Sequence, residues 1–420
     1  MVFIIKNSYL NHKETIHNFT WRFLQIFGKQ GITFFIFVLC AKLLSPYDFG
    51  VYNYILAVIY LLIIFGDFGI STATSKYVAE YNATDKNKLK LVLFNSLILI
   101  VSLGIIVTSV TVLFGSYFLY DKYNYVLYAL PMLFLAPISS LYDGIFRGLK
   151  RFKELAIIVL SVGLISIIFV YLLVLNYGLI GALISQSLFY LVLVLALFFV
   201  YGNLYFQLDR QLMKTILNYS LIIGISSIAY FLYSRVDIIF MGYYGYVEEI
   251  GYYELINRVF TLMMMPFVMF GQVIAPNITK YYSMKKYSVV KLKFKKYLTY
   301  SIFFSTVIVI ATYLLYPVIM ASFLNEYYTQ DFIIIINILL PLFVIKAVGG
   351  GIITQGFTTP TGYAFLNMKI LLFTGLLNII LNYIFIHLFG FIGVIYATFV
   401  VLLLANTTLI AICWKSYMSK

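Results

Sequence analysis

Long apolar segments separated by short polar connectors recur along the whole chain. Each is about 20 residues long, which at a helical rise of ~1.5 Å per residue matches the ~30 Å hydrocarbon core of a bilayer. The pattern predicts an all-α membrane protein of about twelve transmembrane helices. The expected spans are residues 21–44, 51–74, 91–117, 125–146, 155–175, 178–201, 216–242, 251–274, 297–321, 332–353, 368–387 and 391–414.

Composition agrees with this pattern. Hydrophobic residues make up 63% of the 420 residues and charged residues 10%, against roughly 25% charged in soluble globular proteins. A soluble domain this apolar could not cover its core with polar surface, whereas lipid tails solvate apolar side chains directly. Cys40 and Cys413 lie far apart in apolar segments and indicate neither a disulfide framework nor a metal site. We expect no cleavable signal sequence, so that the first apolar helix directs insertion.

Basic residues are distributed unequally between the two ends of the predicted spans. Lys42 and Lys122 are the only ones on the side opposite the N-terminus, whereas the loop at 275–296 alone carries seven lysines. The positive-inside rule then places both termini in the cytoplasm, which gives a multi-pass protein of the cell membrane. This distribution also accounts for the net charge of +14, so we expect no nucleic-acid partner. Attraction of the 275–296 loop to anionic lipid is a secondary possibility.

The two halves of the chain echo each other. DFGVY at 48–52 follows the first span, and EIGYY at 249–253 follows the seventh. YGLIG at 177–181 precedes the sixth span, and FGFIG at 389–393 precedes the twelfth. Both echoes relate helix n to helix n+6, so the halves form a parallel repeat of the kind that transporters use around a central site. We expect an N-terminal segment at 1–20, an N-lobe at 21–201, a linker at 202–215, a C-lobe at 216–414 and a tail at 415–420.

Several segments resemble the Wzx-type O-antigen and polysaccharide flippases of the multidrug/oligosaccharidyl-lipid/polysaccharide exporter superfamily. They are AKLLSPYDFGVY at 41–52, DFGIST at 67–72, KYVAEY at 76–81, GIFRGLKRF at 144–152 and LLNIILNY at 376–383. The resemblance spans nearly the whole chain. It implies two six-helix lobes around a central cavity, and outward movement of undecaprenyl- or dolichyl-diphosphate-linked sugars.

Charged residues within the spans are the candidates for a functional site. A charge at the bilayer centre costs about 2.5–3.5 kcal/mol on insertion scales, so each needs a partner or a wet cavity. Two sets, Glu254 with Arg258 and Asp143 with Arg147, are spaced i,i+4, so we interpret each as a structural pair. The charged residues within the spans are Lys29, Asp67, Asp143, Arg235, Asp237, Glu254, Arg258 and Lys346.

The first span carries a polar stripe. Arg22, Gln25, Lys29 and Thr33 are spaced three, four and four apart and therefore align along one helix face. Such a face cannot meet lipid. Either it is a helix contact in which Lys29 bridges to Asp67, or it is a cationic wall that receives a diphosphate.

Other candidate positions lie in the second half. Arg235 and Asp237, two residues apart, point to nearly opposite helix faces, so one of them should face a cavity. Lys346 has no acid within a turn and is the best single candidate for a functional cation.

Arg22, Lys29, Arg235, Arg258 and Lys346 are the expected diphosphate-binding set, since fixed cations neutralise phosphate charge. The cavity or ion-pair candidates are Asp67, Asp237, Glu254, Asn378 and Asn382.

A polar stripe of Thr374, Asn378 and Asn382 could bind sugar. Such spacing is more often an interhelical hydrogen-bond seam.

The main alternative is an ion-coupled drug exporter of the same superfamily, which would organise its cavity around carboxylates. A membrane glycosyltransferase or polysaccharide polymerase is disfavoured because the outer connectors are short. We therefore expect a transporter with no catalytic residue, cofactor or metal. Its expected partners are the lipid-linked glycan, the bilayer and, as candidates, other polysaccharide-assembly membrane proteins. The coupling ion is left open.

Overall fold

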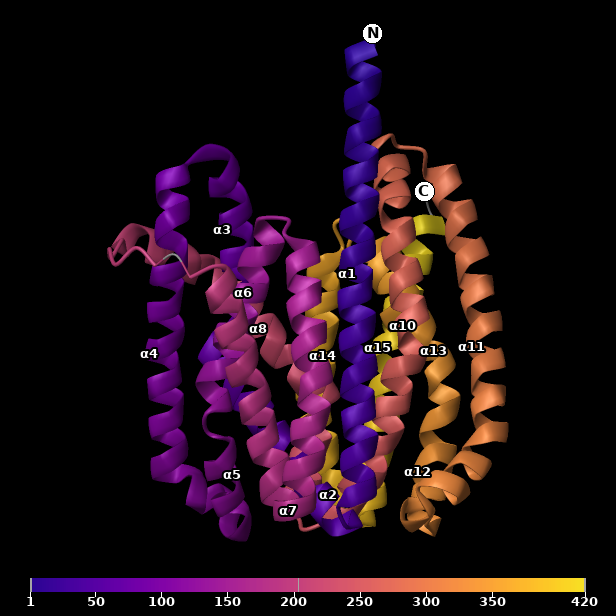
Figure 1. Cartoon of the computed structure of the whole chain (residues 1–420). Coiled ribbons are helices and arrows are strands. Elements are labelled where there is room, and N and C mark those ends of the chain that lie inside the picture. The colour runs from indigo at the N-terminus through magenta and orange to yellow at the C-terminus, as the bar shows by residue number, and fades with distance from the viewer. Residues whose placement is uncertain (1, 203, 419–420) are drawn as a thin grey trace. The chain divides into compact units, whose positions relative to one another are not determined.

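A computed structural model describes residues 2–202 and 204–418. Residues 1, 203, 419 and 420, which fall in the expected N-terminal segment, linker and tail, lie outside the described residues. The described chain is mostly helical and contains no strand, which confirms the predicted all-α class (Figure 1). In chain order its elements are α1 Val2–Leu43, α2 Pro46–Asp67, α3 Ile70–Thr84, α4 Lys86–Leu119, η1 Tyr120–Lys122, α5 Tyr123–Ala129, α6 Met132–Gly148, α7 Phe152–Val200, α8 Arg210–Ser234, α9 Val236–Tyr243, α10 Val247–Ser283, α11 Tyr287–Phe323, η2 Asn325–Tyr327, α12 Gln330–Leu339, η3 Leu340–Leu342, α13 Phe343–Lys346, the π-helix η4 Ala347–Thr358, α14 Ala364–Phe389 and α15 Phe391–Met418.

Ten helical segments of the described chain are long and apolar enough to cross a membrane. Two of them, Lys86–Ala129 and Phe152–Val200, contain 44 and 49 residues, about twice what one crossing needs. The first turns back at Tyr120, which has a φ of 47°, and continues through α5 into α6. The second turns back at Gly178, where φ is 52° and ψ is −129°. Counting both arms of each gives the predicted twelve crossings.

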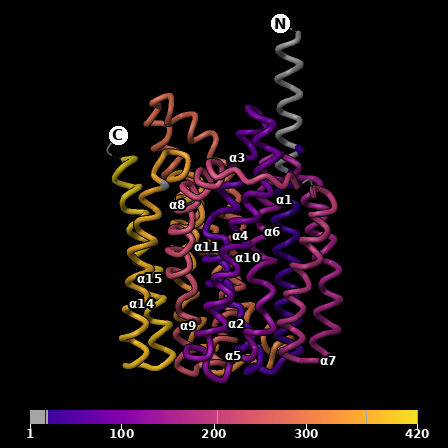
Figure 2. The backbone as a smooth tube through the Cα atoms, turned by 90° about the vertical axis from the view of Figure 1, so that its left-hand side faces the viewer, coloured from indigo at the N-terminus to yellow at the C-terminus, as the bar shows by residue number. Residues whose placement is uncertain are grey.

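Two helical hairpins carry the second sequence echo (Figure 2). Gly178 within α7 and Gly390 between α14 and α15 both have positive φ, 52° and 62°. Three residues later, a methyl group at Gly181 would lie 1.9 Å from the carbonyl oxygen of Leu173. A methyl group at Gly393 would lie 1.9 Å from that of Phe385, again eight residues back. The two hairpins therefore share one local design, in which two glycines let the arms meet backbone to backbone.

The chain forms two compact units. The first comprises the residues up to Ser45 together with Ile55–Ser227, and the second comprises Pro46–Tyr54 together with the chain from Ile228 on. Both α2 and α8 thus contribute to both units. The N-lobe at 21–201 and the C-lobe at 216–414, which were drawn from the sequence, stay a prediction.

The first unit is built around α3, α4, α6 and α7, whose buried side chains form one core. Gly144 and Gly148 of α6 lie against backbone carbonyls of α3, which brings these two helices close together. In the second unit, Gly50 at the start of α2 lies against the carbonyl group of Val247 at the start of α10. The first sequence echo therefore marks a close contact between two helix starts.

Two predicted spans are less regular than expected. The span at 216–242 is interrupted at Arg235, whose φ of −141° and ψ of −12° separate α8 from α9. The span at 332–353 passes through α12, a 3₁₀ turn and α13 before it enters the 12-residue π-helix η4. π-Helical geometry is rare and is found frequently at functional sites.

Candidate functional site

The first unit encloses a polar cavity of about 450 Å³. This volume is in the range of ligand pockets, ~300–1,000 Å³. Five charged side chains line it, Arg22, Lys29, Asp67, Asp143 and Arg147. Its uncharged polar lining consists of Gln25, Gln30, Ser71, Thr72, Ser139 and Ser140.

The predicted stripe of α1 faces this cavity. Arg22, Gln25 and Lys29 all line it, and Lys29 also borders a smaller adjoining pocket of about 50 Å³ together with Thr33. The shared face expected from the spacing is therefore confirmed. Since the cavity is polar, these residues avoid the cost of facing lipid.

Asp143 of α6 is the centre of an ion-pair group. Its carboxylate lies 2.7 Å from Nε of Arg147 and 3.5 Å from a guanidinium nitrogen of Arg22. Gln25 donates to it at 3.1 Å and accepts from Arg22. The predicted Asp143–Arg147 pair is thus confirmed, with Arg22 and Gln25 as additional partners.

Asp67 at the end of α2 serves a different purpose. Its carboxylate accepts hydrogen bonds from the amide, at 3.1 Å, and the hydroxyl of Ser71. These bonds close the turn formed by Phe68 and Gly69, whose φ values are 40° and 81°. No ion pair joins Asp67 to Lys29, so the structure lacks the bridge considered from the sequence. Lys29 forms no ion pair with any residue that the structure describes.

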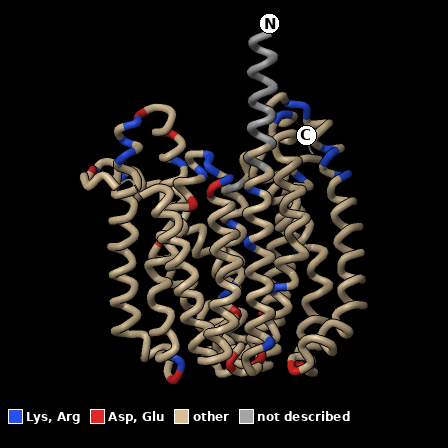
Figure 3. Tube along the Cα trace, in the orientation of Figure 1, with Lys and Arg blue, Asp and Glu red and all other residues tan. Residues whose placement is uncertain are grey.

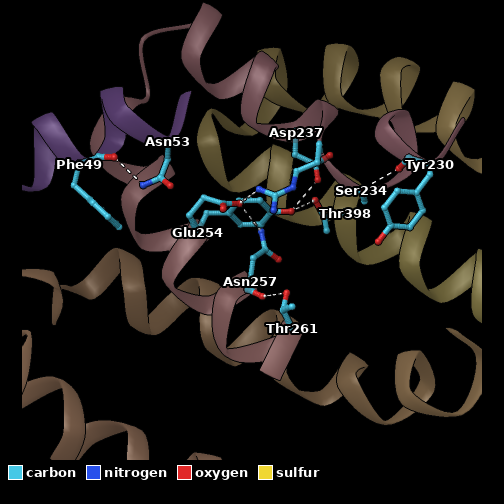
Figure 4. A network of polar contacts seen from close by, with 11 residues as sticks. Phe49, Asn53, Tyr230, Ser234, Asp237, Glu254, Asn257, Thr261 and Thr398 are labelled. Carbon is cyan, nitrogen blue, oxygen red and sulfur yellow. Dashed lines mark hydrogen bonds and ion pairs between the residues drawn. The ribbon is translucent and has the colours of Figure 1, made fainter. Parts of the chain in front are cut away.

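In the second unit, Arg235 binds Glu254. The distance between the guanidinium and the carboxylate is 2.8 Å, and Glu254 is 4% exposed (Figure 4). The sequence predicted Arg258, one turn along α10, as the partner of Glu254. The structure shows Arg235 as a partner of Glu254, because the break at Arg235 brings a cation from 19 residues away onto this carboxylate, and the pairing of Glu254 with Arg258 stays a prediction.

Asp237 is buried in the same network of polar contacts, to which Tyr253 and Asn257 connect it (Figure 4). It is 1% exposed. One carboxylate oxygen accepts from the Tyr253 hydroxyl at 2.8 Å, and the other accepts from Asn378 at 2.8 Å and Asn382 at 3.1 Å. Thr398 completes the network through Tyr253 at 3.3 Å. Asn378 and Asn382 of α14 therefore form the predicted interhelical seam, with α9 as the partner helix.

This network also contains an unsatisfied polar atom. The Oδ1 atom of Asn382 is buried and has no hydrogen-bond partner. No group of three His, Cys, Asp or Glu side chains among the described residues could hold a metal ion.

Lys346 lies at the junction of α13 and η4. It is half-buried, and its Nζ lies 5.9 Å from the centre of the Phe260 ring. It forms no ion pair within the described ranges. A second cation, half-buried Arg258, lies on α10. The structure therefore distributes the candidate residues over both units: Arg22, Lys29 and Asp67 in the first, and Arg235, Asp237, Glu254, Arg258, Lys346, Asn378 and Asn382 in the second.

Comparison with known proteins identifies the family. The family model described as "Polysaccharide biosynthesis protein" matches residues 15–282, well over half of the chain. The chain belongs to this family. An uncharacterised membrane protein of Methanocaldococcus jannaschii is 27% identical over 393 residues, which cover 88% of this chain and 91% of that protein.

Two solved structures show the fold. The inward-facing conformation of a multidrug resistance MATE family transporter of the MOP superfamily matches with a TM-score of 0.79 at 16% identity, covering 95% of this chain and 98% of that one. The lipid II flippase MurJ in its inward closed conformation matches with a TM-score of 0.74 at 16% identity, covering 93% and 86%. This member of the polysaccharide biosynthesis family is therefore a multi-pass membrane protein with the two-lobed fold of these transporters.

Some partners in this family member were missed from the sequence. Tyr253 and Thr398 lie next to Asp237, yet neither is charged, and Tyr253 was noted only as part of the EIGYY echo. Gln25 was noted only as part of a stripe, although it bridges Arg22 to Asp143. Neutral hydrogen-bonding residues are common in membrane helices, so only their three-dimensional placement reveals their partners.

Proposed function

We propose that this chain is a flippase that moves a polyprenyl-diphosphate-linked oligosaccharide from the cytoplasmic to the outer leaflet. The lipid tail would remain in the bilayer, while the diphosphate and the sugars pass through the polar interior of the protein. A charged headgroup cannot cross hydrocarbon unaided. The family description and the fold likeness to a lipid II flippase support this substrate class.

The observation that carries the proposal is the excess of basic over acidic side chains in the cavity of the first unit. Three basic side chains face two carboxylates there, and one carboxylate, Asp143, is shared by Arg22 and Arg147. Lys29 forms no ion pair with a described residue, and Asp67 is engaged by Ser71. An anionic group entering the cavity would give Lys29 a partner through charge-assisted hydrogen bonds.

Native mass spectrometry of the purified protein tests the proposal. The wild type should retain a polyprenyl-diphosphate glycolipid, and Lys29→Gln should retain about tenfold less, because a hydrogen bond to a charged group contributes ~1.5–3 kcal/mol. Lys122→Gln is the matched control, since Lys122 pairs with Asp121 outside the cavity and should leave retention unchanged. Absence of such lipids from the wild type, or equal retention by Lys29→Gln, would overturn the proposal.

A second candidate function is cation-coupled export of a drug-like molecule. The buried Asp237 carboxylate, which has no basic partner among the described residues within ion-pair distance, favours it, as does the fold likeness to a multidrug transporter. Vesicle uptake of cationic dyes driven by a sodium or proton gradient separates the two. Gradient-driven dye transport that Asp237→Asn abolishes and Lys29→Gln leaves intact would favour the exporter.

A further inference from the structure

The connection between α7 and α8 is fixed against the side of α4 by one buried amide. Asn95 of α4 is completely buried. Its Nδ2 donates to the carbonyl oxygen of Gln207 at 3.0 Å, and its Oδ1 accepts from the amide of Asp209 at 2.9 Å. Figure 1 shows this connection passing along the outer side of α4. The backbone of 204–209 is therefore held in one position.

The outer face of this fixed segment is apolar. Phe206 is 80% exposed and Leu208 is 62% exposed, while Tyr205 is also exposed. The ring of Phe206 contacts Phe94 edge to face, with the ring centres 5.2 Å apart. Exposed aromatic and aliphatic side chains beside the start of a membrane-spanning helix are typical of residues placed at headgroup level.

Two lysines lie in the first turns of α4, near the segment. Nζ of Lys90 lies 5.4 Å from the ring centre of Tyr205, and Nζ of Lys88 lies 5.7 Å from that of Tyr81. Both lysines are exposed, and neither forms an ion pair with a residue that the structure describes. Most Lys and Arg of the first unit gather at this end of its helices (Figure 3).

The two nearby acids, Asp85 and Asp209, accept hydrogen bonds from backbone amides. Asp85 caps the start of α4 by accepting from the amides of Asn87 and Lys88 at 3.0 and 3.1 Å. Asp209 caps the start of α8 by accepting from the amide of Leu212 at 2.9 Å. Both carboxylates keep their charge, but neither forms an ion pair with Lys88 or Lys90. A lysine ammonium group beside exposed apolar side chains complements a lipid phosphate above its acyl chains.

We propose that Lys88, Lys90 and the segment 204–209 form a headgroup site for an anionic phospholipid. The ammonium groups bind the phosphate, and Phe206 and Leu208 contact the upper part of the acyl chains. This site is separate from the polar cavity, so it holds whichever molecule the protein transports. In this proposal, the hydrogen bonds of Asn95 keep the segment at headgroup level.

Tryptophan quenching by brominated lipid tests the site. In a Trp21→Phe, Trp414→Phe background, Phe206→Trp reports on the segment in vesicles of mixed phosphatidylcholine and phosphatidylglycerol. Either lipid is brominated in turn. We expect brominated phosphatidylglycerol to quench the tryptophan about fivefold or more strongly than brominated phosphatidylcholine, because each lysine near an anionic lipid contributes ~1 kcal/mol. Adding Lys88→Gln and Lys90→Gln should reduce the preference to near parity.

Two controls are matched to this measurement. Ile106→Trp, lipid-exposed on the same helix α4, should be quenched equally by both lipids. Lys293→Gln with Lys296→Gln removes two lysines that lie over tyrosines in the second unit and should leave the preference at position 206 unchanged. Equal quenching at position 206, or a preference that survives loss of Lys88 and Lys90, overturns the proposal. Weak quenching by both lipids also overturns it, since protein would then cover the segment.

Discussion

At the scale of single residues, some charges inside the membrane-spanning helices are paired with residues from other elements. Glu254 is almost fully buried and is bound by Arg235, which comes from the break between α8 and α9. A buried pair of this kind adds little net stability, because desolvation offsets the attraction. Losing one partner is costly, since the other charge is then stranded in a medium of low dielectric.

The first prediction concerns this pair. Glu254→Gln should lower the melting temperature in detergent strongly, by an amount corresponding to ~3–5 kcal/mol, because Arg235 loses its carboxylate. The double variant Arg235→Gln, Glu254→Gln should recover much of the loss. If Arg235 also binds the substrate, the double variant will be stable and inactive in glycan export. A double variant as unstable as Glu254→Gln would contradict the coupling.

The second prediction concerns Asp143. Asp143→Asn should place Arg22 and Arg147 in the cavity without their shared carboxylate and lower stability by about 1–3 kcal/mol. Added inorganic diphosphate should raise the melting temperature more in this variant than in the wild type, because the anion then replaces the missing charge. Asp85→Asn, which removes a carboxylate outside the cavity, serves as the control. If diphosphate raised the melting temperature equally in the wild type and in Asp143→Asn, that result would contradict an anion-binding cavity.

Spacing along the sequence predicted some partners and not others. Asp143 and Arg147 pair as their i,i+4 spacing indicates, and the stripe of Arg22, Gln25 and Lys29 shares one cavity. The same spacing did not reveal that Arg235 binds Glu254. A helical pattern cannot foresee that the chain leaves helical geometry at Arg235, where no proline or glycine marks the break.

At the scale of elements, glycine pairs determine where the chain turns back. The sequence echo of YGLIG and FGFIG predicted a repeat, and both copies form the same hairpin. The regular spans were predictable because their length and hydrophobicity are set by the bilayer. The π-helix η4 was not, since hydrophobicity does not distinguish it from an α-helix.

The third prediction follows from these hairpins. Gly181→Ala and Gly393→Ala should each destabilise the protein severely or prevent its accumulation, because the added methyl group meets a backbone carbonyl that cannot move aside. Gly31→Ala is the control. A methyl group there meets nothing within 4 Å, so the melting temperature should stay level or rise, as alanine favours helix by ~1 kcal/mol. Melting curves for Gly181→Ala that coincide with those of Gly31→Ala would refute the hairpin packing.

At the scale of the whole molecule, the asymmetry of basic residues predicts the orientation in the membrane. Seven lysines lie before and within the first turns of α11, at 280, 285, 286, 291, 293, 295 and 296. The other end of α11 is followed by Glu326 and Asp331. Lys291 also donates to the carbonyl oxygen of Met418 at 3.0 Å, so the end of α15 lies on the lysine-rich side. Within the second unit, the lysine-rich loop before α11 and the C-terminal end of α15 therefore lie on the same side.

The last prediction tests this orientation across α11. Its 37 residues extend about 55 Å at ~1.5 Å per residue, so Ser288 and Glu326 lie on opposite sides if the helix crosses the bilayer. In a background with the two buried cysteines, Cys40 and Cys413, replaced by alanine, an impermeant maleimide added to intact cells should label Glu326→Cys and spare Ser288→Cys. After permeabilisation both positions should react, because both side chains are exposed. Labelling of position 288 alone in intact cells would invert the orientation, and equal labelling of both would show that α11 does not cross. The expected result places the lysine-rich loop and the end of α15 in the cytoplasm, as the attraction of basic residues to that side requires.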